Sequence, residues 1–221
     1  MSTKERKGQS QLIPLLWVRR SIGFLGILLP PALVLGTMLF SHCDFILGAV
    51  SDYYHSIVRD VFVGVICVIA LFLFTYRGYD KTDDIAANLA CFFALGVAFL
   101  PTSAKEINCG EYGFYQFPVL HNICAVSFFL VITYFSLFQF PQTEKDHEPT
   151  PEKQKRNRVY RTCGYIMLAS IILIGLDELL DRALTKALGL PFTIMFIGEW
   201  VALWAFGTSW LVKGEFILED N

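Results

Sequence analysis

One run of ten residues gathers side chains that could act in acid–base, binding or metal chemistry: Ser51-Asp52-Tyr53-Tyr54-His55-Ser56-Ile57-Val58-Arg59-Asp60. A continuous helix turns by about 100° per residue, so residues four and eight positions apart share a face. Charges at the head of an apolar run are costly unless they are paired or functional. A solvated helix end would give the same pattern. The residues on one helical face are Ser51, Asp52, His55 and Arg59.

We expect this run to form a polar site. In that site Ser51 and Asp60 are candidate catalytic groups, and Asp52, Tyr53 and Arg59 are candidate substrate-binding groups.

Three of the four histidines, His42, His55 and His121, are expected on one side of the molecule. Imidazoles with a carboxylate suit zinc, and three protein ligands plus a water make a hydrolytic centre. The sequence has no HxxxH, HExxH or CxxC motif to fix such a site. A zinc site is therefore one hypothesis, and hydrogen-bonded histidines at helix ends are the other.

Glu199 is the third candidate catalytic residue, because it interrupts an apolar segment. It lies nine residues, or roughly 13 Å, below the outer end of that segment. An ionisable group at such a depth usually faces the interior of a helix bundle and serves a function. A neutral glutamate that bonds to a neighbouring helix is the alternative.

The whole chain has the composition of a membrane protein. Of its 221 residues 54% are hydrophobic and 17% are charged, and the mean hydropathy is +0.50. A soluble domain carries about 25% charged residues. Apolar blocks of roughly 20 residues match about 30 Å of hydrocarbon. We therefore expect one all-α membrane domain over residues 1–221, with six spans at 21–40, 57–76, 84–101, 119–140, 159–180 and 190–212, and a kink at Pro30 and Pro31.

The basic residues indicate the orientation. Fourteen of the 18 lysines and arginines fall in the two terminal segments and in the loops after the second and fourth spans. Basic residues stay in the cytoplasm, so both termini are expected there, in a multi-pass protein of the cell membrane. Residues 141–157 are expected to form a flexible cytoplasmic linker. The net charge is −2, so the charge balance does not indicate nucleic-acid binding.

Cysteine usage leaves one open question at the outer surface. Cys43 and Cys109 fall in the expected outer loops, where they form a disulfide or stay as two thiols. The other four cysteines lie within spans and act as small apolar side chains.

Two families share parts of this pattern. Ser51-Asp52 after the first span, with His121-Asn122-Ile123-Cys124-Ala125 and Phe128-Phe129 opening the fourth, resembles the Frag/DRAM/Sfk superfamily of six-helix membrane proteins. That resemblance implies a membrane protein connected with lipids. Ser51-x3-His55 and Asp60 are similar to the zinc-dependent alkaline ceramidase and progestin-receptor superfamily, which has seven spans and a final HxxxH that this chain lacks. There, His121 or His42 would have to replace the missing ligands.

Three functions follow as hypotheses. The first is a lipid-handling protein with a polar cavity in the outer leaflet. The second is a metal-dependent hydrolase of a lipid amide or ester, with a metal-bound water. The third is a proton-coupled transporter that uses Glu199 and His55 as a relay. The residues expected around the cavity are Ser51, Asp52, His55, Asp60, His121 and Glu199.

Overall fold

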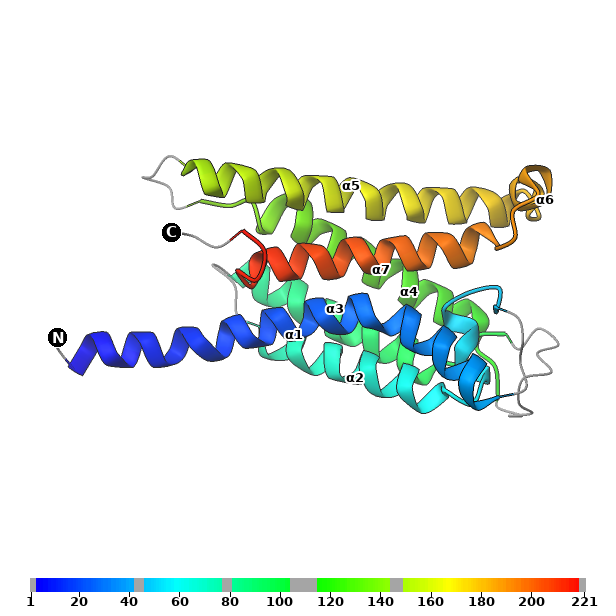
Figure 1. Cartoon of the computed structure of the whole chain (residues 1–221), viewed down its shortest axis with the longest axis horizontal. Helices are drawn as coiled ribbons and strands as arrows, with labels where there is room; N and C mark the ends of the chain where they lie inside the picture. The colour runs from blue at the N-terminus through cyan, green and yellow to red at the C-terminus, as the bar shows by residue number, and fades with distance from the viewer. Residues whose placement is uncertain (1–2, 42–45, 77–80, 104–114, 144–148, 219–221) are drawn as a thin grey trace.

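A computed structural model describes residues 3–41, 46–76, 81–103, 115–143 and 149–218 (Figure 1). All regular structure in these ranges is helical, which confirms the predicted all-α class. The helices are α1 (Thr3–Phe40), α2 (Arg59–Thr75), α3 (Lys81–Phe99), α4 (Pro118–Tyr134), α5 (Pro151–Leu179), α6 (Ala183–Leu188) and α7 (Ile194–Lys213). A 3₁₀ turn, η1 (Ser51–His55), precedes α2, and a π-helical turn, η2 (Phe135–Gln139), continues α4.

The six long helices form a closed ring. Each of α1 to α5 packs against the next, and α7 closes the ring between α5 and α1. In Figure 1 these helices run side by side along the long axis, and α1 begins at the end of the bundle where α7 finishes. The 3₁₀ turn η1 and the short helix α6 lie at the opposite end.

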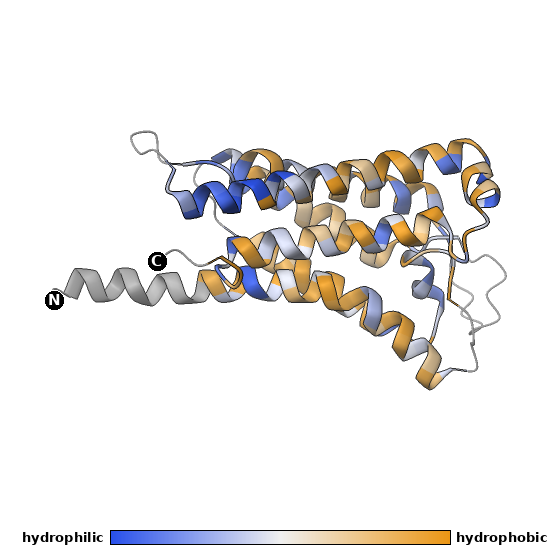
Figure 2. Cartoon of the chain, turned by 45° about the horizontal axis from the view of Figure 1, so that its top comes forward, coloured by the Kyte–Doolittle hydropathy of each residue, from blue (hydrophilic) through white to orange (hydrophobic). Residues whose placement is uncertain are grey.

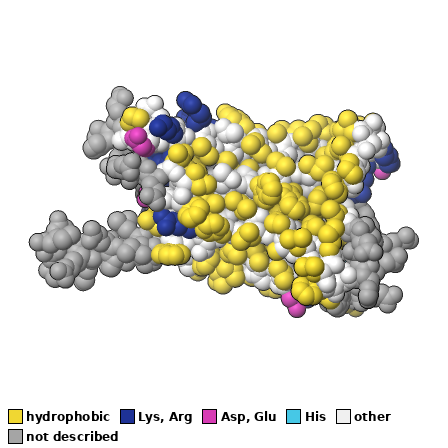
Figure 3. Space-filling view, in the orientation of Figure 1, with side chains coloured by type: hydrophobic (Ala, Val, Ile, Leu, Met, Phe, Trp, Pro, Cys, Tyr) yellow, Lys and Arg dark blue, Asp and Glu magenta, His cyan; other side chains and the backbone are white. Residues whose placement is uncertain are grey.

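The outer surface of the bundle is apolar. Within the described ranges, five helices are long and apolar enough to cross a membrane: Leu15–Phe40, Lys81–Phe99, Pro118–Gln139, Pro151–Leu179 and Ile194–Lys213. Apolar side chains cover the middle of the molecule, while the lysines and arginines visible in this view gather at its two ends (Figure 3). Large side chains such as Leu71, Phe92 and Val119 point outward, with 60%, 65% and 69% of their surface exposed. These features make the chain an integral membrane protein. Helix α2 is the sixth expected span. It has 17 residues and is not one of these five helices.

Helix α5 begins earlier than the hydropathy indicates. The linker expected at 141–157 is wrong from Pro151 onward, because the helix already starts there. The Thr150 side chain accepts a hydrogen bond from the Lys153 amide, 3.1 Å away, and Pro151 takes the first helical position. A threonine followed by proline is a standard start signal for a helix. The first turns of α5 are hydrophilic, so the helix extends beyond its apolar part (Figure 2).

Glycines bring α1 and α7 into close contact. A Cβ atom on Gly207 would lie 2.6 Å from the Gly23 carbonyl oxygen, and one on Gly26 would lie 2.8 Å from the Phe206 ring. Small residues at such crossings let two membrane helices approach closely. Helix α1 passes through Pro30 and Pro31 as one continuous helix. The glycine contact holds α7, and with it Glu199, against α1.

Arg20 also links α1 and α7, at the end of the bundle where α1 begins and α7 finishes. Its Nε donates to the Gly214 carbonyl at 2.7 Å, and its Nη2 donates to the Glu215 carbonyl at 3.0 Å. The guanidinium thus binds carbonyls at the C-terminus of α7, where a positive charge is also favoured by the helix dipole.

Candidate functional site

The run from Ser51 to Asp60 does not form the continuous helix that we expected. Residues Ser51–His55 make one 3₁₀ turn, and Ser56 is extended, with φ −113° and ψ 173°. The Ser56 hydroxyl donates to the Tyr53 carbonyl at 2.8 Å and accepts from the Val58 amide at 3.3 Å, which stabilises the break. Helix α2 then begins at Arg59, beyond this break. Ser51, Asp52 and His55 are buried in the turn, whereas Arg59 stands half-buried beyond the break, so these four residues do not share one helical face as expected.

Glu199 of α7 anchors the start of this turn. Its Oε2 accepts from the Val50 amide at 2.6 Å and the Ser51 amide at 3.2 Å, and its Oε1 accepts from the Ser51 hydroxyl at 3.1 Å. The Thr193 hydroxyl, just before α7, also donates to the Gly48 carbonyl. A carboxylate that accepts several N–H and O–H bonds can stay within an apolar bundle because these donors replace water.

His55 and His121 converge on one short segment after α3. His55 donates from Nε2 to the Thr102 carbonyl at 2.8 Å, and His121 donates from Nδ1 to the Leu100 carbonyl at 2.7 Å. A carbonyl oxygen only accepts, so these two nitrogens carry the protons. Both side chains are buried, with 1% of their surface exposed. The opposite nitrogens, His55 Nδ1 and His121 Nε2, are buried and have no hydrogen-bond partner among the described residues.

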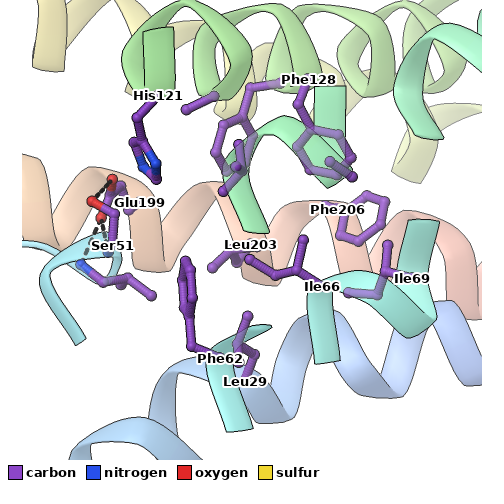
Figure 4. Close-up of a pocket in the computed structure, with 15 residues that line it drawn as sticks. Leu29, Ser51, Phe62, Ile66, Ile69, His121, Phe128, Glu199, Leu203 and Phe206 are labelled. Atoms are coloured by element: carbon purple, nitrogen blue, oxygen red, sulfur yellow. Dashed lines mark hydrogen bonds between the residues drawn. The ribbon is translucent and has the colours of Figure 1, made fainter. Parts of the chain in front are cut away.

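A cavity of about 50 Å³ lies beside these groups, between α1, α2, α3, α4 and α7. Ser51, His121 and Glu199 form its polar end, and the His121 ring points into it toward Glu199 (Figure 4). This space has room for a few water molecules, since one water needs roughly 10–15 Å³ of such volume. The rest of the wall is apolar and includes Leu29, Phe62, Ile69, Phe128, Leu203 and Phe206.

Two of the expected binding residues are buried beside the cavity without lining it. Asp52 is 9% exposed and lies close enough to Glu199 for their charges to repel. Tyr53 is 1% exposed, and its hydroxyl accepts from the Leu47 amide at 3.5 Å. Burial raises the pKa of the Tyr53 phenol, so this side chain is neutral. Asp52 and Tyr53 are thus buried parts of the turn η1 and do not line the cavity.

Arg59 and Asp60 lie away from the cavity, on the flank of the bundle. Arg59 donates to the Tyr54 hydroxyl at 3.0 Å, and its guanidinium stands 4.8 Å from the centre of the Tyr54 ring. The Asp60 side chain is 95% exposed and lies 3.5 Å from Arg59. An exposed carboxylate of this kind is solvated, so the position does not favour the catalytic role that we expected of Asp60.

The described residues do not complete the three-ligand zinc site. They contain no group of three or more histidine, cysteine or acidic side chains placed to hold a metal ion. His55 and His121 each have one nitrogen with a lone pair, but His42 lies outside the described residues. Catalytic zinc takes three protein ligands, so two imidazoles alone do not fit it. Cys43 and Cys109 also fall outside the described residues, so the disulfide and the two free thiols both stay open as predictions.

Sequence reasoning missed the apolar wall and the carbonyls that orient the histidines. The Leu100 and Thr102 carbonyls flank Pro101, whose ring prevents helical continuation and leaves nearby carbonyls available. Pro101 is thus the sequence feature that could have indicated these two available carbonyls. Phe62 and Phe206 resemble any other core aromatic, so no sequence pattern distinguishes them. Comparison with protein families, with curated proteins and with solved structures gives no match, so a functional assignment has to rest on this geometry.

Proposed function

We propose that the chain is a six-span protein of the cell membrane that binds a lipid in the cavity beside η1. The observation that carries the proposal is the composition of the cavity wall. Three polar side chains, Ser51, His121 and Glu199, stand at one end, and aromatic and aliphatic side chains form the remainder. A lipid has the same division into a polar head and an apolar chain, and ligand sites typically combine an apolar wall with a few polar groups.

The topology that we propose counts α2 as the sixth span. It stands in the ring between α1 and α3, and it exposes Leu71 and Phe74 as a lipid-facing helix would. Six crossings return the chain to its starting side. The excess of basic residues assigns that side to the cytoplasm. The cavity then opens at the depth of the outer leaflet.

The small size of the cavity sets how a lipid would enter. Its 50 Å³ is far below the roughly 300 Å³ at which pockets for small molecules begin. An alkyl chain would therefore enter by displacing water and by rotating aromatic side chains of the wall, such as Phe62 and Phe129. Both rings line the cavity and can change rotamer without breaking a hydrogen bond.

The test is lipid capture by the full chain in mild detergent. A photoactivatable lipid with a diazirine on its acyl chain should crosslink to residues of the cavity wall. The variant Ala125→Leu, which fills the cavity, should reduce crosslinking at least fivefold. Ala169→Leu makes the same change on the exposed face of α5 and serves as the control. Equal crosslinking of both variants at surface positions alone would overturn the lipid site.

Proton-coupled transport is the second candidate, and the volume of the cavity favours it. A few water molecules between Glu199 and His121 could carry a proton between a carboxylate and an imidazole. In liposomes, this function requires a pH-dependent flux that Glu199→Gln abolishes. Flux that does not depend on pH would contradict proton-coupled transport.

A further inference from the structure

We infer that the ligand of this cavity is a lipid whose headgroup donates hydrogen bonds, such as a hydroxyl-bearing neutral lipid, and not an anionic lipid. This inference rests on the proposed function and assigns its ligand class. It follows from the hydrogen-bonding capacity that remains at the polar end of the cavity after the protein's own bonds are counted.

His121 offers the ligand an acceptor. Its Nδ1 proton is committed to the Leu100 carbonyl, and no carboxylate lies within ion-pair distance of the ring among the described residues. A buried imidazole without such a partner is neutral, because an isolated buried charge is costly. Its Nε2 is therefore a lone pair, buried and without a partner, on a ring that points into the cavity (Figure 4).

Ser51 and Glu199 also offer only acceptors. A carboxylate has about four lone-pair positions. Three of those on Glu199 are filled, by the Val50 amide, the Ser51 amide and the Ser51 hydroxyl. The hydroxyl hydrogen of Ser51 is thereby used, and both amide hydrogens are used as well. What remains is one position on Glu199 Oε1 and the lone pairs of the Ser51 oxygen.

The described part of the cavity wall provides no positive charge to complement these acceptors. None of the described residues that line it is a lysine or an arginine. A phosphate or carboxylate headgroup would meet the lone pair of His121 Nε2 and the oxygens of Ser51 and Glu199 without a compensating cation, which is unfavourable in a buried site. A hydroxyl or an N–H group would instead satisfy the buried Nε2 of His121, and unsatisfied buried acceptors are costly.

Three probes with the same oleoyl chain test this inference: monooleoylglycerol, its dimethyl ether and oleate. Monooleoylglycerol has two hydroxyl donors, the ether has none, and oleate is an anion. Each competes against the photoactivatable lipid on the full chain. We expect monooleoylglycerol to compete at concentrations at least tenfold lower than either other probe. Equal competition by all three, or tighter binding of oleate, would overturn the headgroup assignment and leave the lipid site standing. If none of them competes and no lipid is captured, both the assignment and the proposed function fail.

A variant that adds a donor gives a readout that does not depend on total binding. Glu199→Gln replaces one side-chain oxygen at the polar end of the cavity with an N–H donor, so the ratio of oleate to monooleoylglycerol binding should rise at least tenfold. A variant that merely loosened the fold would lower both affinities and leave their ratio unchanged, which would contradict the inference. Glu178→Gln makes the same change on an exposed residue at the same end of the bundle and should keep the wild-type ratio.

Discussion

Glu199 and Ser51 stand 148 positions apart in the chain and are joined by two hydrogen bonds, one to the Ser51 amide and one to its hydroxyl. Together with the bond to the Val50 amide, they fasten the turn after the first span to the last helix. The carboxylate thus has a structural role as well as a place in the cavity wall. Stability and ligand binding have to be measured separately for every variant of this pair.

Removal of the carboxylate should destabilise the protein more than removal of the hydroxyl. Ser51→Ala deletes one charge-assisted bond and should cost about 1–2 kcal/mol. Glu199→Ala leaves the Val50 and Ser51 amides without an acceptor and should cost about 3 kcal/mol or more. Thermal unfolding of the purified variants in one detergent checks this order. An equal loss in both would mean that the two amides find water when the carboxylate is absent.

The glycine contact between α1 and α7 should tolerate no side chain. Gly207→Ala would place a Cβ 2.6 Å from the Gly23 carbonyl oxygen, so the two helices must separate. Overpacking of this kind typically costs about 1–3 kcal/mol, and we expect a lower unfolding temperature. Gly175→Ala is the matched control, because its Cβ would meet nothing within 4 Å and alanine favours a helix. A Gly207→Ala protein as stable as the control would show that the helices adjust freely.

The outline of the fold could be predicted from the sequence because hydrocarbon thickness fixes the length of an apolar block. The same rule failed at Pro151, since a helix that leaves the hydrocarbon region continues as long as its cap and propensity allow. The turn at Ser51–His55 could not be predicted either. No glycine or proline marks the break at Ser56, which depends on the hydroxyl of that residue and on Glu199 from the far end of the chain.

Two candidate residues show where sequence reasoning about the site succeeded and where it could not. Glu199 faces the interior, as the cost of an exposed charge in an apolar helix requires. Asp60 is also acidic and lies within the run from Ser51 to Asp60, yet its side chain is 95% exposed in the first turn of α2, beyond the break at Ser56. Whether a polar side chain turns inward depends on the path of the backbone, and that path was fixed by contacts distant in sequence.

The purified protein should hold well below one zinc ion per chain. Among the described residues, only His55 and His121 offer imidazole nitrogens without a hydrogen-bond partner, and catalytic zinc takes three protein ligands. Elemental analysis of the wild type beside a His55→Ala/His121→Ala variant measures this directly. One zinc per chain, lost in the variant, would instead show that a third ligand comes from outside the described residues. That result would favour the metal-dependent hydrolase over the lipid site that we propose.

Accessibility of single cysteines should show that α2 crosses the membrane. Asp60 at its start is exposed, and so is Lys81 at the start of α3. If α2 spans the bilayer, a cysteine at position 60 reacts with a membrane-impermeant maleimide added to intact cells, and a cysteine at position 81 reacts only after the cells are opened. The six native cysteines must first be replaced by serine or alanine.

A third cysteine fixes the absolute orientation. Arg158→Cys on the hydrophilic start of α5 is exposed and should behave like position 81, because the basic residues there are expected in the cytoplasm. Positions 60 and 81 reacting alike would mean that α2 does not cross. The bundle would then have five spans, and the two termini would lie on opposite sides of the membrane. The basic residues would in that case indicate the wrong side for one terminus. If position 60 reacts in intact cells and positions 81 and 158 react only after the cells are opened, α2 crosses the membrane and the cavity lies in its outer half.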